Sequence, residues 1–403
     1  MSLKPGAEVD LDVEKAAAGG RMLARHLGQV VLVSGAIPGE RIRARIERVA
    51  KGVTYAETIA VVTPSADRRP PPGDPRCGGQ VLAHIDYPRQ VSLKAEIIQD
   101  AFRRIGRVPL PSPPPMLSAA EEGYRMRTRL HVQGTRIGFF LEGTHQVCGA
   151  APSRQLSAGA VAWIAEAERA LEAHAGHGLT AIELSENIAA TQRAIHLELH
   201  AGADVGALPE LAGETHVSDI VQAGSGAPLV LRRDVRAFFQ GNRYLIQPLV
   251  DAVLGALDAA PVVDLYAGVG LFGLAAAAAG HHAVVLVEGD PISSADLVSN
   301  ATPFGGVVTV VRRSVESFLS SLATIGDATV IVDPPRTGMS RDALRALIAL
   351  RPRRLIYVSC DVATLARDTR TLIDGGYELE SLTGVDMFPN TAHVESVALL
   401  RRT

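Results

Sequence analysis

Residues 264–273 read Asp-Leu-Tyr-Ala-Gly-Val-Gly-Leu-Phe-Gly and directly follow the apolar pair Val262-Val263. Gly268, Gly270 and Gly273 have the spacing of a nucleotide-binding turn between a strand and a helix. Glycines at these positions let a ligand come close to the helix N-terminus, where backbone N–H groups are free to bind it. The stretch therefore predicts a strand–helix unit of an α/β domain with a ligand site at its turn.

Short apolar strands alternate with helical segments from residue 233 to the end of the chain. The predicted strands include 262–265, 283–287, 307–311, 329–332 and 355–358, and the predicted helices include 271–279, 315–322, 341–350 and 362–374. Buried strands that alternate with helices indicate a parallel sheet covered on both faces. We therefore expect a Rossmann-like domain over residues 233–403, with ligands at the carboxyl ends of its strands.

Two acids lie close to the glycine turn. Asp264 ends the first strand, where a carboxylate disfavours a pyrophosphate and suits a cationic ligand such as the amino acid end of S-adenosylmethionine. Glu288 ends the second strand, where an acid can accept hydrogen bonds from ribose hydroxyls. Because both kinds of cofactor contain a ribose, Glu288 does not distinguish them. A nicotinamide dinucleotide site therefore stays open as an alternative.

A third acid, Asp333, directly follows the strand 329–332 and precedes Pro334, Pro335 and Arg336. Prolines fix the backbone and remove donors, so this turn is expected to be rigid. Methyltransferases that act on amino groups have a similar turn with an aromatic residue after the prolines. Arg336 in that place argues against methylation of an exocyclic amine, and a purely structural turn is the alternative interpretation.

Cys360 and Glu395 also lie at ends of predicted strands. Cys360 stands between the strand 355–358 and the helix 362–374. Because a helix N-terminus lowers the pKa of a thiol and exposes it, Cys360 is a candidate nucleophile, although an isolated cysteine is usually a small core residue. Glu395 begins the last strand and is either a solvated acid or a general base that reaches the same ligand as Cys360.

The N-terminal segment 1–64 predicts a small closed β-barrel, because short alternating strands are separated by glycine-containing turns. Arg41, Arg43 and Arg45 share one face of a strand. That face is either part of an OB-like platform for nucleic acid or a solvated face partly neutralised by Glu47.

A proline-rich linker at 68–75 separates this barrel from a central domain, expected over residues 65–232. Within it, Arg125, Arg127 and Arg129 alternate along a predicted strand, so all three should point to one face. Like charges repel unless an anion neutralises them, so the trio is the best candidate for contact with nucleic acid phosphates. A wet sheet face balanced by acids from neighbouring strands is the alternative.

Composition sets the outer bounds. The chain has 403 residues, which suffices for two or three domains, and its net charge of −3 means that any nucleic acid binding depends on local patches. Three widely separated cysteines, Cys77, Cys148 and Cys360, exclude a disulfide scaffold and a simple zinc knuckle. The N-terminus is not a signal peptide, and the longest apolar stretch, 271–280, is too short to cross a bilayer. We expect a cytoplasmic monomer without a membrane partner.

Several of these motifs together resemble the bacterial RNA 5-methyluridine methyltransferases, which have an N-terminal TRAM barrel, a central domain and a class I methyltransferase domain. The matching stretches are 238–242 (Phe-Phe-Gln-Gly-Asn), 264–270, 333–336, 358–361 and 393–396. The resemblance implies S-adenosylmethionine as cofactor and a cofactor site made of Gln240, Tyr266, Gly268, Gly270, Glu288 and Asp333.

The resemblance also implies a reaction. Cys360 would add to carbon 6 of uracil, and Glu395 would later remove the proton from carbon 5. The target base must leave its stack to meet both groups, so the expected partner is a loop or bulge of RNA. The N-terminal barrel favours ribosomal RNA over transfer RNA as the substrate, because the transfer RNA enzymes of the family lack it.

Many members of the family hold an iron–sulfur cluster through a Cys-x5-Cys-Gly-Gly-Cys run and a distant fourth cysteine. Here Cys77 is followed by Gly-Gly-Gln, and Pro71 and Gln80 occupy two of the ligand positions. The rest of the local pattern, His84, Tyr87, Gln90 and Lys94, is present, and Cys148 is at best a shifted fourth ligand. Two thiols rarely retain such a cluster, so we expect no cluster and no other metal.

Two other classes of function compete with this interpretation. A nicotinamide-dependent oxidoreductase would rest on the glycine turn alone and would leave Cys360 and Glu395 without a role. A non-catalytic RNA-binding or assembly factor on a methyltransferase fold would not need either residue. Methylation of cytosine is disfavoured as well, because those enzymes place their cysteine after a proline and here Ser359 precedes it.

Overall fold

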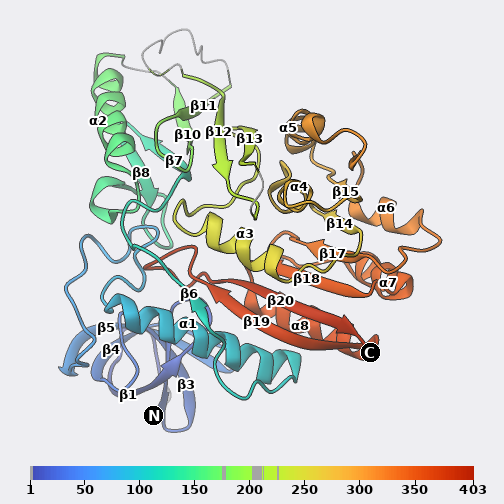
Figure 1. The fold of residues 1–403 in the computed structure, drawn as a ribbon. Coiled ribbons are helices and arrows are strands. Elements are labelled where there is room, and N and C mark those ends of the chain that lie inside the picture. The colour runs from blue at the N-terminus through green and yellow to red at the C-terminus, as the bar shows by residue number, and fades with distance from the viewer. Residues whose placement is uncertain (1–2, 175–177, 202–210, 212, 225–226) are drawn as a thin grey trace.

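The computed structural model describes residues 3–174, 178–201, 211, 213–224 and 227–403, and Figure 1 shows their arrangement. The N-terminal strands close into a barrel in the order β1-β2-β3-β5-β4. They are β1 (Glu8–Ala16), β2 (Met22–His26), β3 (Gln29–Ser34), β4 (Arg41–Ala50) and β5 (Val53–Thr63). Along β4, Ile42, Ala44 and Ile46 point into the barrel core, which is the alternation expected from the sequence.

The arginines on the outer face of β4 are largely neutralised. Arg43 pairs with Asp10 at 2.9 Å, and Arg45 lies 3.4 Å from both Glu8 and Glu57. Exposed pairs of this kind add little stability, but they cancel the positive field that a phosphate would need. The pairing supports the solvated interpretation of this face, although Glu47, the expected neutralising acid, pairs instead with Arg21 at 2.7 Å.

The central part of the chain forms a five-stranded antiparallel sheet in the order β11-β10-β7-β8-β9. Its strands are β7 (Arg127–Gln133), β8 (Arg136–Phe140), β9 (Val147–Gly149), β10 (Leu179–Glu186) and β11 (Arg193–Leu199). Helix α2 (Ala158–Ala173) begins at the cap Ser157 and packs its apolar side on this sheet. A separate hairpin, β12 (His216–Val221) and β13 (Leu229–Asp234), follows and contacts the C-terminal helices.

The C-terminal sheet has eight strands in the order β16-β15-β14-β17-β18-β20-β19-β6, with β20 antiparallel to both of its neighbours. Its strands are β14 (Val262–Leu265), β15 (Val284–Val287), β16 (Val308–Val311), β17 (Thr329–Val332), β18 (Arg354–Ser359), β19 (Tyr377–Val385), β20 (Glu395–Arg402) and β6 (Met116–Leu117). The flanking helices are α3 (Ile246–Gly255), α4 (Leu271–Ala278), α5 (Pro291–Ala301), α6 (Val315–Ser320), α7 (Arg341–Leu350) and α8 (Val362–Asp374).

Alternate residues of the buried strands feed two separate cores. Along β17, Ile331 packs with the core on the α3–α5 face, whereas Val330 and Val332 pack with the core on the α6–α8 face. The expected fold class, an N-terminal barrel followed by a Rossmann-like methyltransferase-type domain, is confirmed by this architecture. Among the described residues, no helix combines the length and apolar character needed to cross a membrane.

Helix α1 (Tyr87–Ala101) lies between the barrel and the C-terminal sheet, as Figure 1 shows. Leu93 and Ile97 pack into the barrel core, and Ile98 and Ala101 pack into the core of the α6–α8 face. The π-helical turn Phe102–Gly106 and strand β6 continue this connection onto β19. The segment 87–117, which lies inside the expected central domain 65–232, thus packs mainly against the two other parts.

Candidate active site

Strand pairing brings Cys360 and Glu395 to the same edge of the sheet. Strands β18 and β20 are antiparallel, and their last paired residues are Ser359 and Ser396. Cys360 follows Ser359, and Glu395 precedes Ser396. Because the strands are antiparallel, the register that pairs the two serines places Cys360 opposite Glu395. Asp333 follows β17, the other neighbour of β18, and therefore lies at the same edge.

The electrostatics of Cys360 differ from the expectation. Burial, together with the nearby Glu395 and Asp333 carboxyls, raises the pKa of its thiol to about 11 against the opposing effect of Arg336. The pKa of the Cys360 thiol is thus raised on balance, whereas its place before a helix led us to expect a lowered one. The N-terminus of α8 is already capped by Asp361, whose carboxylate accepts a hydrogen bond from Thr364 N at 2.8 Å.

Glu395 is 4% exposed, and its Oε1 accepts no hydrogen bond from any residue that the structure describes. Burial and the neighbouring Asp333 raise the pKa of Glu395 well above its usual value. Burial also raises the pKa of Asp333 to about 7, although Gln240 Nε2 donates to its Oδ2 at 3.1 Å. The site thus gathers buried acids that a bound cation would stabilise in their ionised form.

The glycine turn is built as the sequence predicts. Gly270 has a φ of 103°, and a Cβ there would lie 2.4 Å from Leu274, so only glycine fits. Tyr266 precedes the turn with a left-handed φ of 61°. Glu288 Oε2 accepts a hydrogen bond from Gly268 N at 2.8 Å, which fixes the carboxylate beside the turn.

Asp264 supports the turn from below. Its Oδ2 accepts a hydrogen bond from Gly273 N at 2.8 Å, and its Oδ1 has no partner among the described residues. Burial raises the pKa of Asp264 to about 8. The side chain is 1% exposed, and the contact that the structure shows is with the first turn of α4. The charges of Asp333 and Glu288 also act on this carboxyl.

The three arginines predicted to share one face do not form one row. Strand β7 begins only at Arg127, and Arg125 precedes it. Arg129 lies on the central sheet, 2.5 Å from Glu198, and opposes Glu183 in register. Here the alternative, a sheet face balanced by acids, describes the structure.

Arg125 instead lies near Phe388 and Arg336. Its guanidinium carbon is 5.9 Å from the ring centre of Phe388, and the charge of Arg336 is near enough to lower the pKa of Arg125 further, beyond the larger effect of burial. Arg127 lies 5.9 Å from the ring centre of the exposed Phe238. The sequence suggested no role for Arg336 beyond its not being aromatic. In the structure, its charge lowers the pKa of both Cys360 and Glu395.

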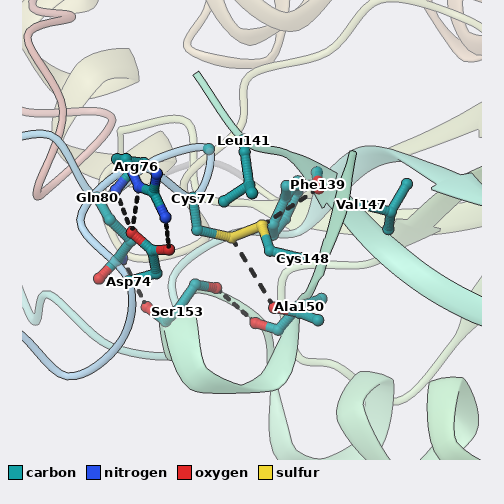
Figure 2. Close-up of a disulfide and its surroundings, with 12 residues drawn as sticks. Asp74, Arg76, Cys77, Gln80, Phe139, Leu141, Val147, Cys148, Ala150 and Ser153 are labelled. Carbon is teal, nitrogen blue, oxygen red and sulfur yellow. Dashed lines mark hydrogen bonds and ion pairs between the residues drawn. A yellow bond between two sulfur atoms is a disulfide. The ribbon is translucent and has the colours of Figure 1, made fainter. Parts of the chain in front are cut away.

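Cys77 and Cys148 form a disulfide that connects the segment just after the proline-rich linker to β9, as Figure 2 shows. The sequence did not predict this pairing, since the residues are separated by 71 positions. Gln80 is fully buried beside it and donates from Nε2 to the carbonyl of Ser153 at 3.0 Å. Closing a loop of this length contributes up to about 4 kcal/mol in the chain-entropy model.

The residues at this place do not fit an iron–sulfur cluster, because two thiols are joined to each other and an amide fills a further ligand position. Across the described part of the chain, no group of three or more His, Cys, Asp or Glu side chains is arranged to hold a metal ion.

Comparisons with known proteins point to one family. A family model described as tRNA (Uracil-5-)-methyltransferase matches residues 221–403, and a TRAM domain model matches residues 3–59. The 23S rRNA (uracil(1939)-C(5))-methyltransferase RlmD of Alkalilimnicola ehrlichii is 31% identical over 95% of this chain and 94% of its own length. The RlmD protein of Halomonas elongata is also 31% identical, over 97% of this chain and 89% of its own length.

Among solved structures, the Pyrococcus abyssi tRNA (uracil-54, C5)-methyltransferase in complex with S-adenosyl-L-homocysteine superposes with a TM-score of 0.76. It is 22% identical, and the match covers 97% of this chain and 99% of that one. This likeness shows that the two proteins share the fold over nearly the whole chain, the N-terminal barrel included. The expectation that transfer RNA enzymes of the family lack the barrel is therefore wrong, and the barrel does not favour ribosomal RNA as the substrate.

Proposed function

Since this chain belongs to the family of RNA uracil-C5 methyltransferases, which use S-adenosylmethionine, we propose that it methylates uracil through a covalent bond to Cys360 and proton removal by Glu395. The observation that carries the proposal is the register of strands β17, β18 and β20, which places Cys360 opposite Glu395 and next to Asp333. An oxidoreductase or a non-catalytic RNA-binding factor would give this pairing no role.

The chemistry follows from the weak nucleophilicity of carbon 5 of uracil. The Cys360 thiolate adds to carbon 6, which turns the ring into an enolate with a nucleophilic carbon 5. When bound, S-adenosylmethionine supplies the electrophilic methyl group that carbon 5 takes up. Glu395 then accepts the proton from carbon 5, and the electrons of that C–H bond expel the Cys360 thiolate.

The raised pKa values suit these roles. A carboxylate whose pKa lies well above its usual value is a stronger base once it is ionised, which favours proton transfer to Glu395. The Cys360 thiol must lose its proton before it adds to carbon 6. A cation held near Asp333 would lower the pKa of Cys360 and so favour the thiolate.

The residues of the site fit S-adenosylmethionine, which carries two positive charges. The buried Asp264 and Glu395 each have a carboxyl oxygen without a partner among the described residues, and a nearby cation would favour the ionised form of both groups. We propose that Asp333 and Gln240 hold the charged end of the cofactor, and that a second group holds its nucleoside end. That second group consists of Tyr266, Gly268, Gly270 and Glu288.

We expect the affinity for S-adenosylmethionine to rise about tenfold between pH 6 and pH 8. The Asp333 carboxyl, with a pKa of about 7 in the free protein, must be ionised to attract a cation, so affinity grows as pH rises through 7. Binding near pH 7 should release protons, which calorimetry in two buffers with different ionisation enthalpies measures. The Asp333→Asn variant should bind more weakly and show a smaller rise in affinity between pH 6 and pH 8, because Asp264 and Glu395 still titrate. Equal wild-type affinities at pH 6 and pH 8 would contradict this assignment.

We propose that the RNA substrate is ribosomal, because the two RlmD relatives, named as 23S rRNA enzymes, are 31% identical to this chain, whereas the tRNA enzyme that shares its fold is 22% identical. Sequencing of 5-methyluridine sites in RNA from cells that lack this protein tests the proposal. Loss of a site in ribosomal RNA is the expected result. Loss of a transfer RNA site would instead match the activity named for the structural neighbour.

Of the predicted RNA-binding arginines, we propose that Arg125 and Arg127 contact the RNA and that Arg129 does not. Arg125→Met should weaken binding of a substrate RNA about tenfold, because this cation lies beside Phe388 and near Arg336, three residues after Asp333. Arg129→Met should change the affinity less than about twofold, because its charge is already paired with Glu198. Filter binding at several salt concentrations measures both, and equal losses in the two variants would overturn the distinction.

A further inference from the structure

The segment that leads into Glu395 is held from one side by helix α1. Residues 386–394 connect β19 to β20 and contain no helix or strand. Within this segment, Asn390 has a left-handed φ of 64° although it is not a glycine. A non-glycine residue keeps such a conformation only where its surroundings fix it.

Lys94 on α1 supplies the first fixed point. Its side chain and that of Asp386 are both 0% exposed, and Lys94 Nζ donates a hydrogen bond to Asp386 Oδ1. Lys94 Nζ also donates to the backbone carbonyl of Phe388 at 2.9 Å. One ammonium group thus sets the positions of two residues that lie more than 290 positions further along the chain.

Gln90, one helical turn before Lys94, supplies the second fixed point. Its Nε2 donates to Asn390 Oδ1 at 2.9 Å, and its Oε1 accepts from Asn390 N at 2.9 Å. Arg69 Nη2 adds a donor to the same Asn390 Oδ1 at 3.0 Å, and Leu82 N donates to the Asn390 carbonyl at 2.9 Å. Both the side chain and the backbone of Asn390 are therefore bound.

The opposite side of the segment is closed by residues of the central and C-terminal parts. Asn242 Nδ2 donates to the Met387 carbonyl at 3.2 Å, and Tyr124 OH donates to the Pro389 carbonyl at 3.3 Å. A Cβ at Gly241 would lie 2.8 Å from the Phe388 ring, so the backbone approaches this ring closely. The segment has little freedom to shift as long as α1 holds it.

We propose that Lys94 and Gln90 are positioning residues, which set the Glu395 carboxyl for removal of the carbon 5 proton. The proposal rests on the role proposed above for Glu395. Neither side chain is shown in contact with Cys360, Asp333 or Glu395, so their influence passes through the backbone of residues 386–394. A displacement of a catalytic group by about 1 Å can cost about 100-fold in rate.

If Lys94 and Gln90 only stabilised the fold, a different result would be expected. A buried ion pair often contributes no more stability than apolar side chains of similar size, whereas removing one partner alone is strongly destabilising. The double variant Lys94→Met/Asp386→Leu removes both charges together and avoids an unpaired buried charge. Gln90→Met changes no charge and removes the reciprocal pair of hydrogen bonds to Asn390.

The test separates bond formation to Cys360 from product release. Each variant is mixed with uridine RNA and S-adenosylmethionine, and the covalent protein–RNA complex and free 5-methyluridine are followed over time. Positioning of Glu395 predicts that the complex forms within about threefold of the wild-type rate while release slows about 10- to 100-fold, so that the complex accumulates. The melting temperature is measured in parallel to report the folded fraction.

Glu40→Gln is the matched control. Like Asp386, Glu40 is a buried carboxyl with a cationic partner, but that partner is Arg68 and the pair lies at the barrel. It should lower the melting temperature without accumulation of the covalent complex. The positioning role is overturned if the rates of complex formation and product release fall together in Gln90→Met and in Lys94→Met/Asp386→Leu. It is also overturned if the release rate is unchanged in both variants. If the wild-type protein forms no covalent complex even with 5-fluorouridine RNA, the proposed function itself has failed, which is a distinct outcome.

Discussion

Replacement of Cys360 by alanine is expected to lower the rate of RNA methylation at least about 10⁴-fold. Without the sulfur, no bond forms at carbon 6, and carbon 5 of uracil stays too weak a nucleophile to take a methyl group. Transfer of radiolabelled methyl groups to RNA measures the loss, and denaturing electrophoresis measures the covalent complex with 5-fluorouridine RNA. This variant should form none of the complex.

The double variant Cys77→Ser/Cys148→Ser is the matched control, because it removes the disulfide and leaves Cys360, the one free cysteine in the described structure, in place. It should melt at a lower temperature and still form the complex with 5-fluorouridine RNA. Covalent complex in the Cys360→Ala variant, or none in the control while it remains folded, would contradict the assignment of the nucleophile.

Glu395→Gln is expected to lower turnover about 10³-fold and to convert the short-lived intermediate into a stable product. An amide cannot accept the proton from carbon 5, so the methylated base stays bonded to Cys360. Ordinary uridine RNA should then give a protein–RNA band that survives denaturation and carries one methyl group per RNA.

Asp333→Asn is the control for this experiment, because it alters a neighbouring acid of the same buried group. It should raise the S-adenosylmethionine concentration needed for half-maximal rate without accumulation of the complex. Glu395→Gln protein that releases 5-methyluridine at the wild-type rate would exclude Glu395 as the base.

Much of the architecture could be predicted because its signals are local. The glycine turn at Gly268 and Gly270, and the polar residues Asp333 and Cys360, follow short apolar strands whose carboxyl ends meet at one edge of any parallel sheet. Glu395 joins them because β20 runs antiparallel to β18, which places the start of one strand beside the end of the other.

The properties that were not predicted depend on the environment created by folding. The thiol pKa of Cys360 rises because the group is buried and because Glu395 and Asp333, which are distant in the sequence, lie near it. Arg125 leaves the expected row because its backbone pairs with Leu156 and Asn242 before β7 begins. The contact of Lys94 with Asp386 spans 292 positions, and a lone lysine in a helical pattern gives no sign of such a partner.

The measurement that tests the central claim most directly is the mass of the complex formed by wild-type protein with 5-fluorouridine RNA and S-adenosylmethionine. Fluorine at carbon 5 cannot be removed as a proton, so Glu395 has nothing to accept and the adduct persists. Proteolysis and mass spectrometry should locate a methylated fluorouridine on the peptide that contains Cys360. A nucleotide bonded to any other residue, or methylated RNA without a bond to the protein, would contradict the account.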